Sequence, residues 1–387
     1  MLLVENCSVV TRPKIVHFRW IAVDEGRIHS TGRMAREHPE PTGKLDAGGM
    51  LAVPGFIDIH THGGFGLSLA DGNPDSIRAY ARQIVKHGVT GFLVTIAASP
   101  VAEMEAALAA TREAMTDPEP GAARVLGANL EGPYLSAQAA GAQDLASLRP
   151  IDARECEDWL LAFPGVVKIL TLAPELAGAR SLIQVLAKRG VVPAIGHTAA
   201  SYEETADAIK AGAWLATHTY NGMRRFHHRD PGPAGAVLAS EEIHAECISD
   251  GVHVHPGAFL MLVAAKGYDR VVLVSDGSPA TGLPDGEHII GGQKLIVTNG
   301  TVRLESGTLA GTATFLDAHL RVAHAALGDD LAKLLRALGP NQARLVGCMD
   351  DLGAIEPRKH ADITFLTEDL RVRMTMIAGE VVHRGPS

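Results

Sequence analysis

The central part of the chain alternates short apolar runs with stretches whose apolar residues recur at helical spacing. The runs lie at residues 55–60, 89–96, 125–130, 167–173, 191–197, 214–218, 243–250 and 270–276. Helical spacing occurs between them, for example at 102–115 and 202–211, and this alternation is typical of parallel strands joined by helices. Eight such units are the number found in a TIM-like (β/α)8 barrel. A doubly wound α/β sheet is the alternative, but no phosphate-binding loop follows the first strand.

Both ends of the chain differ from this central part, because they consist of short strand-like segments separated by turns. Residues 21–30 predict a hairpin that turns at 24–26, and three further strands are predicted at 361–366, 372–377 and 379–383. Because chain termini often lie close together, we expect both ends to build one small β-sandwich domain. The expected division assigns 1–52 and 351–387 to this β domain and 53–350 to the barrel.

The composition indicates a well-packed protein without a nucleic-acid or membrane partner. Of the 387 residues, 46% are hydrophobic and 20% are charged, which is enough for a large core. The net charge is -9 and no lysine-rich or arginine-rich run occurs, so nucleic acid is not an expected partner. No apolar stretch reaches the roughly 18 residues that suggest a membrane-spanning helix. The N-terminus lacks a secretory pattern and the four cysteines stand singly, so we expect reduced thiols and a cytoplasmic location.

Histidines and carboxylates stand at the ends of the predicted barrel strands. These metal-competent residues are His60, His62, Glu131, His197, His218 and Asp276. In a barrel of this kind the carboxyl ends of all strands meet on one face, where active sites lie. Imidazole nitrogen and carboxylate oxygen suit zinc, iron or manganese. The sequence therefore predicts a metal site at that face.

A lone histidine in an apolar run is more often a hydrogen-bonded core or surface residue than a ligand. His60 and His62, however, are two positions apart, and such residues face the same side of a strand. The coincidence of ligand types at several strand ends favours a site over the structural interpretation. Four other histidines, taken alone, are expected to face solvent or at best to bind substrate: His227, His228, His253 and His255.

Several segments together resemble a known family. Pro54-Gly-Phe-Ile-Asp-Ile-His-Thr-His-Gly-Gly is similar to the opening metal motif of the amidohydrolase superfamily. The resemblance is narrowed by Leu130-Glu-Gly-Pro-Tyr-Leu-Ser, Ile195-Gly-His-Thr, Thr217-His-Thr-Tyr-Asn-Gly-Met, His227-His-Arg-Asp-Pro-Gly, Asp250-Gly-Val-His, Val274-Ser-Asp-Gly, Thr308-Leu-Ala-Gly-Thr and Gly353-Ala-Ile-Glu-Pro-Arg-Lys-His-Ala-Asp. This set, which covers nearly the whole chain, resembles the N-acetylglucosamine-6-phosphate deacetylase family of that superfamily.

The resemblance implies a metal-dependent hydrolase that removes the acetyl group of an N-acetylhexosamine 6-phosphate. Glu131, His197 and His218 would hold the metal common to the family, and His60 and His62 would hold a second one. The expected cofactor is thus one or two divalent ions per subunit, with zinc first and iron, manganese or cobalt as alternatives. Asp276 would be the catalytic carboxylate, accepting a proton from water and returning it to the departing amine.

The resemblance also implies a set of substrate-contacting residues: Ala142, Gln143, Asn221, Gly222, Arg229, His253, Leu309, Ala310 and Gly311. Arg229 would bind the sugar phosphate, in the family usually across the interface of a homodimer. A guanidinium offers a planar fork for phosphate oxygens. A surface ion pair with Asp230 is the plain alternative for this arginine.

Two residues depart from the family pattern, and other functions stay open. Asn129 and Gln143 stand where the family usually has histidine, so the substrate could be another N-acetylated hexosamine phosphate or a non-sugar acyl amine. A cyclic-amide hydrolase or a deaminase is the second hypothesis, although Lys168 lies too early in its run for the carboxylated lysine that bridges many such centres. A non-catalytic scaffold is the third, and it predicts loss of ligands that are all present. Gluco or galacto configuration, and one metal or two, are not decided by the sequence.

Overall fold

A computed structural model describes residues 1–11, 14–33, 38–328 and 331–386. A parallel sheet forms its centre, with the strand order β15-β14-β13-β12-β11-β10-β9-β6. The strands are β6 (Phe56–Asp58), β9 (Val89–Ala97), β10 (Arg124–Glu131), β11 (Val167–Leu172), β12 (Val192–Ile195), β13 (Leu215–Ala216), β14 (His244–Cys247) and β15 (Val271–Leu273). Each lies within or across one of the eight predicted runs.

The two end strands of this sheet meet just beyond β6 and β15. The amide of Asp276 donates to the carbonyl of His60 at 2.9 Å, and the amide of His62 donates to the carbonyl of Gly277 at 2.7 Å. These bonds bring the first and the last strand together at their carboxyl ends. The predicted TIM-like α/β barrel is therefore confirmed. Its closure places the candidate site residues His60 and Asp276 side by side.

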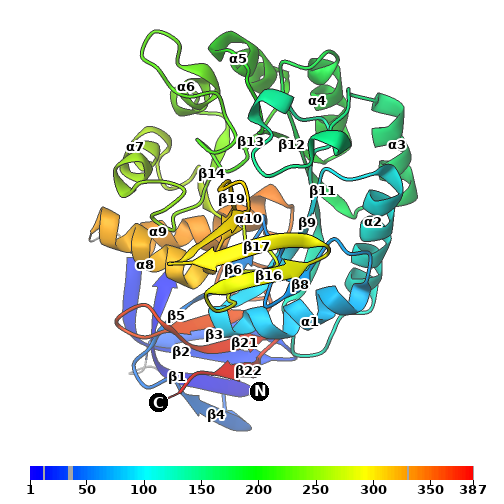
Figure 1. The fold of residues 1–387 in the computed structure, drawn as a ribbon. Helices are drawn as coiled ribbons and strands as arrows, with labels where there is room; N and C mark the ends of the chain where they lie inside the picture. Colours follow the sequence, from blue (N-terminus) through cyan, green and yellow to red (C-terminus); the bar gives the residue numbers. More distant parts are fainter. Residues whose placement is uncertain (12–13, 34–37, 329–330, 387) are drawn as a thin grey trace.

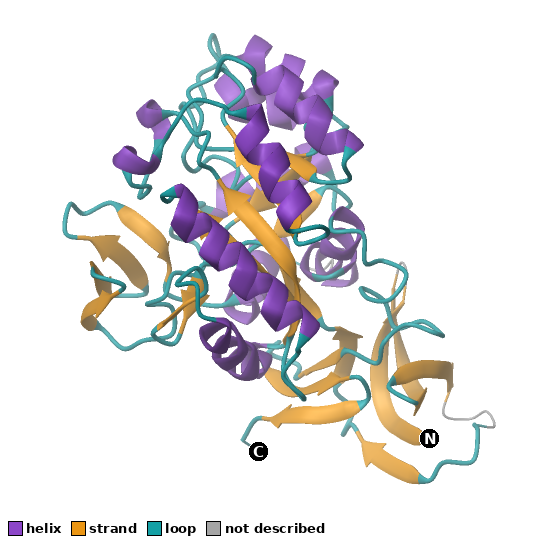
Figure 2. Ribbon diagram, turned by 90° about the vertical axis from the view of Figure 1, so that its right-hand side faces the viewer, coloured by secondary structure: helices purple, strands orange, loops and turns teal. Residues whose placement is uncertain are grey.

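Helices surround the barrel (Figures 1 and 2). They are α1 (Pro74–Ile84), α2 (Val101–Thr116), α3 (Ala153–Ala162), α4 (Ala179–Lys188), α5 (Tyr202–Ala211), α6 (Gly232–Ala239), α7 (Pro256–Lys266), α8 (Leu316–Leu327), α9 (Leu331–Leu334) and α10 (Pro340–Leu345). Short 3-10 turns lie at η1 (Val85–His87), η2 (Ala137–Ala139), η3 (Leu145–Ser147) and η4 (Leu335–Leu338). The predicted helix at 202–211 is confirmed, because Ser201 and Glu204 form a capping box and Gly212 ends it in a left-handed conformation.

The barrel interior is filled from its amino-terminal end. Ile57, Ile169 and Val272 point into one buried cluster, which also contains Ala343 and Leu345 of α10. The start of α10 approaches the start of β6, since a Cβ on Gly339 would lie 3.1 Å from the carbonyl of Gly55. The opposite, carboxyl-terminal mouth is thus the end at which polar side chains gather.

Both chain ends join one eight-stranded sheet, as the sequence predicts for a β domain. Its main order is β22-β21-β20-β5-β1-β2-β3, and β4 pairs with β1. The strands are β1 (Leu2–Thr11), β2 (Lys14–Asp24), β3 (Arg27–Arg33), β4 (Gly43–Asp46), β5 (Leu51–Pro54), β20 (Ile363–Leu366), β21 (Val372–Ile377) and β22 (Glu380–Arg384). The predicted turn at 24–26 is confirmed, with Glu25 and Gly26 at φ 46° and 74°. Figure 1 shows both termini on this sheet, below the barrel.

A third sheet is inserted between β15 and α8, and the sequence did not reveal it. It is antiparallel and consists of β16 (Gly286–Ile290), β17 (Gln293–Thr298), β18 (Thr301–Leu304) and β19 (Leu309–Thr312). Its apolar side chains pack with Ala142, so Ala310 and Ala142 belong to one cluster beside the mouth. A two-stranded sheet, β7 (Gly63–Gly64) and β8 (Leu67–Ser68), follows β6. In the described part of the chain no helix is both long enough and apolar enough to cross a membrane.

Candidate metal centre

Glu131, at the end of β10, is the shared carboxylate of the centre. Its Oε1 lies 2.8 Å from Nε2 of His218 and 3.0 Å from Nε2 of His197, and these two nitrogens are 3.1 Å apart. All three side chains are almost fully buried. The three residues therefore form one group whose ligand atoms lie close enough to hold a single metal ion.

His60 and His62 face the same carboxylate from β6. Nε2 of His60 lies 3.4 Å from Oε1 of Glu131, and Nε2 of His62 lies 3.2 Å from Oε2. These three residues form a second group with metal-ligand spacing. Glu131 is a member of both groups, so a bridging carboxylate between two cations is geometrically available.

The hydrogen bonds behind the histidines fix which nitrogen faces the centre. Nδ1 of His197 lies 2.9 Å from the carbonyl of Ala139, and Nδ1 of His218 lies 3.1 Å from that of Asn221. A carbonyl only accepts, so each Nδ1 carries the proton and a neutral ring has its lone pair on Nε2. This is how metal-binding histidines are oriented in proteins, and the residues therefore fit a metal ion.

The backbone turns sharply where three of these side chains leave their strands. His197, His218 and Asp276 have φ angles of 44°, 25° and 47°, in the left-handed region that non-glycine residues avoid. Gly222 makes room for one of the rings, because a Cβ on it would lie 3.0 Å from Nδ1 of His197. Tight turns thus aim the imidazoles inward at a local conformational cost.

Asp276 completes the centre opposite Glu131. Its Oδ1 lies 3.5 Å from Nε2 of both His60 and His62. Burial would raise the pKa of Asp276, but the hydrogen bond from His62 and the nearby histidine charges lower it to about 2. Burial would lower the pKa of His62, but hydrogen bonds to Asp276 and Glu131 raise it to about 9. Since metal ligands must be deprotonated, a divalent cation would take the place of these imidazole protons.

The two residues that depart from the family pattern have different surroundings. The side-chain nitrogen of Gln143 donates to Oε2 of Glu131 at 2.7 Å, and its oxygen accepts from the amide of Ala98 at 3.0 Å. Gln143 therefore lies at the centre and holds the shared carboxylate. Asn129 is fully buried and donates to the carbonyl of Ile59 at 3.0 Å, so it is a structural residue of the barrel wall.

The other predicted substrate residues gather around the mouth, with one exception. His253 is held by Asp250, whose Oδ2 lies 2.7 Å from its Nδ1. Gly311 lies against Asp276, because a Cβ on it would lie 2.7 Å from the carbonyl of that residue. Leu309 and Ala310 belong to the same strand, β19. The exception is Arg229, which lies in an exposed loop.

Arg229 does not form the ion pair with Asp230 that the sequence offered as an alternative. Asp230 forms its ion pair with Arg224 instead. Nη1 of Arg229 lies 2.9 Å from Nε2 of His228. Among the described residues, no hydrogen bond or ion pair of Arg229 connects it with the metal centre of its own chain. A role for Arg229 at such a centre would therefore require contacts other than these.

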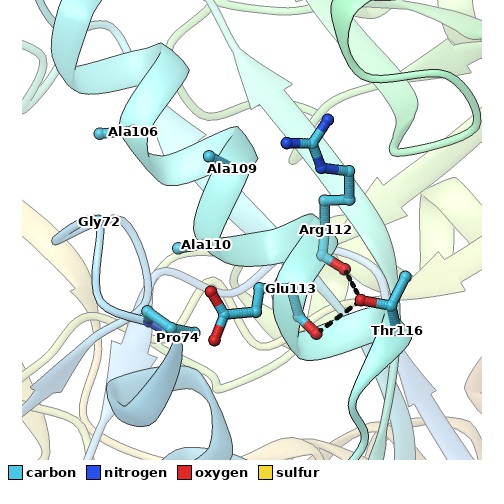
Figure 3. A pocket seen from close by; sticks show the side chains of 8 residues that line it. All are labelled: Gly72, Pro74, Ala106, Ala109, Ala110, Arg112, Glu113 and Thr116. Atoms are coloured by element: carbon cyan, nitrogen blue, oxygen red, sulfur yellow. Dashed lines mark hydrogen bonds between the residues drawn. The ribbon is translucent and has the colours of Figure 1, made fainter.

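A cavity of about 460 Å³ lies beside the metal centre. Its lining includes Ala139, Gly141 and Gly222, which surround His197, together with the cationic Arg224 and Arg225. A larger groove of about 580 Å³ lies between the start of α1 and α2, and none of its lining residues belongs to the candidate metal ligands (Figure 3). Small side chains line most of that groove, and its one carboxylate, Glu113, pairs with Arg78. The smaller cavity is therefore the candidate for a substrate.

Sequence reasoning missed two carboxylates that support the centre. Asp250 ends the predicted strand 243–250 and opens one of the motifs of the family resemblance, but the sequence assigned it no role, yet it orients His253. Glu246, in the middle of β14, was not singled out, yet its Oε2 lies 3.0 Å from Nδ1 of His60. The signal that could have identified Glu246 is the presence of a glutamate within a largely apolar predicted strand.

Fold and site together define a class: a TIM-like barrel with a histidine–carboxylate metal-binding centre at the carboxyl ends of its strands. The sequence matches the amidohydrolase family model over residues 51–382. The chain belongs to the amidohydrolase family, whose members are metal-dependent.

Relatives and solved structures narrow this placement. The chain is 32% identical to N-acetylglucosamine-6-phosphate deacetylase from Bacillus subtilis (strain 168), over 98% of this chain and 96% of that protein. It is 33% identical to N-acetylgalactosamine-6-phosphate deacetylase from Escherichia coli O157:H7, over 94% and 95%. A solved mutant of N-acetyl-D-glucosamine-6-phosphate deacetylase from Mycobacterium smegmatis, in complex with N-acetyl-D-glucosamine-6-phosphate, matches with a TM-score of 0.92. That match has 30% identity and covers 98% of this chain and 99% of the other.

Proposed function

We propose that this protein hydrolyses the acetamide of an N-acetylhexosamine 6-phosphate to the amino sugar phosphate and acetate. The observation that carries the proposal is the convergence of four histidine Nε2 atoms on Glu131, with Asp276 facing them. The near full-length similarity to deacetylases of two such sugars supports the substrate class.

The metal would be held by the two groups that share Glu131. His197 and His218 would complete one position, and His60 and His62 the other. A bound divalent cation, zinc in the first instance, would lower the pKa of its water and polarise the amide carbonyl. The imidazole tautomers described above keep the Nε2 lone pairs directed at these positions.

Asp276 would move the proton. Its Oδ1 would accept a proton from the attacking water as the new carbon–oxygen bond forms. It would then give this proton to the amine nitrogen as the carbon–nitrogen bond breaks, which is general base followed by general acid catalysis. Gln143 would keep Glu131 in place during this exchange, because both ends of its amide are already engaged.

The substrate would occupy the 460 Å³ cavity beside His197. Ala142, Asn221, Gly222, His253 and the strand Leu309–Thr312 would surround the sugar. A phosphate on a protein of net charge -9 needs local positive charge, which Arg225 in the lining of this cavity would provide. Guanidinium groups suit phosphate because they bind its oxygens bidentately.

We also propose a homodimer in which Arg229 binds the phosphate of the neighbouring subunit's substrate. Arg229 makes no contact with its own metal centre among the hydrogen bonds of the described residues, and apolar side chains are exposed in its loop and on α7. Phe226 is 53% exposed and Met261, on α7, is 59% exposed. Their burial between subunits would stabilise the dimer by removing apolar surface from water.

A complementation experiment tests the shared site. Asp276→Asn and Arg229→Ala are each expected to be nearly inactive alone. If Arg229 serves the other subunit, each mixed dimer regains one intact site of its two and about half of the wild-type activity. No recovery in verified mixed dimers would reject the exchange of Arg229. Light scattering of wild type and Met261→Glu would report whether the dimer exists and depends on this surface.

The substrate assay is a panel of acetylated amino sugars. We expect acetate release from N-acetylglucosamine 6-phosphate or N-acetylgalactosamine 6-phosphate, and kcat/KM lower by about 100-fold or more for the sugars without phosphate. Arg229→Ala should remove this preference, whereas Arg189→Ala, a surface arginine paired with Glu157, should not. Equal rates with and without phosphate would reject the role of Arg229, and hydrolysis of neither phosphorylated sugar would reject the function.

The domain boundaries and the cellular location are also proposals. The expected boundaries were 1–52, 53–350 and 351–387. We propose a β domain of 1–54 and 351–387 with a barrel of 55–350, because β5 pairs with β20 along its whole length and with β1 at Leu51 and Ala52. We propose a cytoplasmic location, which the four free thiols at Cys7, Cys156, Cys247 and Cys348 support. Limited proteolysis and cell fractionation test these two points.

A further inference from the structure

Glu246 is a buried carboxylate next to the candidate metal ligands, and the proposed reaction does not use it. It lies in β14 and is 0% exposed. Its side chain contacts His60, which follows β6, and His218, which follows β13, one residue from each group of candidate ligands. A buried carboxylate is costly unless its charge is matched, so its position calls for a specific role.

One oxygen of Glu246 contacts both groups of ligands. Oε2 accepts from the backbone amide of His218 at 2.9 Å and lies 3.0 Å from Nδ1 of His60. The other oxygen, Oε1, has no hydrogen-bond partner among the described residues. The glutamate is therefore oriented by the centre itself and not by a separate structural network.

These contacts determine how His60 can bind a cation. Because a carboxylate accepts hydrogen bonds, Nδ1 of His60 is the donor and Nε2 of the neutral ring carries the lone pair. That Nε2 has no hydrogen-bond partner within the described chain and faces Glu131 at 3.4 Å. A carboxylate behind a ligating imidazole also makes the imidazole more basic and a better ligand.

We propose that Glu246 is the positioning residue that makes the group of His60, His62 and Glu131 competent to hold a second divalent cation. This inference rests on the proposed function, since it concerns the same site. Glu246 supplies a third carboxylate, beside Glu131 and Asp276, to balance the charge of two cations. The backbone amide of His218 in turn donates to this carboxylate and holds it in place behind His60. Glu246 does not touch substrate.

The test is metal binding by the whole protein, stripped of metal and titrated with Zn²⁺ against a chromophoric chelator. Wild type is expected to bind two Zn²⁺ per subunit. Glu246→Gln keeps an oxygen acceptor and removes the charge, whereas Glu246→Ala removes both. We expect second-site affinity to fall about 10-fold in the first variant and up to about 100-fold in the second, while first-site affinity stays within about threefold.

Matched variants separate this role from a general structural one. His60→Ala removes a ligand and should show the single-ion stoichiometry that Glu246→Ala approaches. Glu155→Gln alters a carboxylate that pairs with Arg149 away from the centre, and should retain both ions. The visible spectrum of Co²⁺-loaded protein should lose one component in Glu246→Ala, a change that a purely structural residue would not cause selectively.

Three results would overturn the inference: a wild type that binds a single ion, a Glu246→Ala variant whose second-site affinity is within threefold of wild type, or an equal loss at both sites. None of them depends on turnover. If two ions bind as described but no N-acetylhexosamine phosphate is hydrolysed, the proposed function fails while the role of Glu246 stands.

Discussion

Oε1 of Glu131 lies 2.8 Å from Nε2 of His218, although the two residues are 87 positions apart in the chain. The contact exists because the ends of β10 and β13 open onto the same mouth of the barrel. A carboxylate shared by two groups of histidines makes this residue the one on which both metal positions depend.

Replacement of Glu131 by Gln should abolish metal binding at both positions. The variant is nearly isosteric, so the fold is retained, but the amide is a poor ligand. Added Zn²⁺ should raise the melting temperature of wild type by mass action and leave that of Glu131→Gln unchanged. Glu155→Gln should respond like wild type. A Zn²⁺-dependent rise in melting temperature for Glu131→Gln would contradict the assignment.

Asp276→Asn should separate catalysis from metal binding. The amide cannot accept a proton from water, so kcat should fall by roughly 10²–10⁴-fold. Metal content, measured by elemental analysis, should stay close to that of wild type because the histidines and Glu131 are intact. Activity near the wild-type level would reject Asp276 as the proton carrier, and loss of metal would instead make it a ligand.

Gly222→Ala should disturb His197. Gly222 has a φ of +57°, and the new Cβ would lie 3.0 Å from Nδ1 of the ring, so the imidazole must shift. We expect at least a 10-fold loss of kcat/KM together with about 1 kcal/mol of destabilisation from the backbone. Gly165→Ala is the matched control, because Gly165 has a φ of +76° and nothing within 4 Å of its Cβ. It should lose stability alone. An equal effect of both variants on kcat/KM would contradict this contact.

Stability should fall in mild acid because of His244. Burial, followed by the charge of Arg270, lowers the pKa of His244 to about 4. The unfolded chain takes up this proton near pH 6.5 and the folded chain only near pH 4, so the free energy of unfolding decreases as the pH falls through that window. Between pH 7 and pH 5 the expected loss from this residue is about 2 kcal/mol.

His244→Phe checks this pH dependence. The aromatic ring retains the edge contact with Trp214, whose ring centroid lies 5.2 Å from that of His244. Urea unfolding should show a smaller difference between pH 7 and pH 5 in the variant, by about 2 kcal/mol. Above pH 7.5 the slopes against pH should coincide. The same acid sensitivity in both proteins would place the titrating group elsewhere.

The amino-acid pattern was enough to predict the barrel and the side chains that gather at the candidate metal centre. The apolar runs that lead into His60, Glu131, His197 and Asp276 predict that these side chains gather, because all strands of a closed parallel barrel end on one face. The hairpin at 24–26 and the capped helix at 202–211 were equally readable, since their signals lie within a few residues.

The polar groups that support this centre became visible in the folded chain alone. The contact of Glu246 with His60 spans 186 positions and depends on how the barrel closes between the segments that follow β15 and β6, which no local pattern encodes. The same holds for the amide of Gln143 at Glu131 and for Arg229, which contacts His228 and not Asp230. The inserted sheet of β16–β19 was missed because its strands are short and partly exposed, so their pattern is weak. Strand periodicity fixes which residues can face the barrel mouth, but hydrogen bonding between distant segments fixes what each one does there.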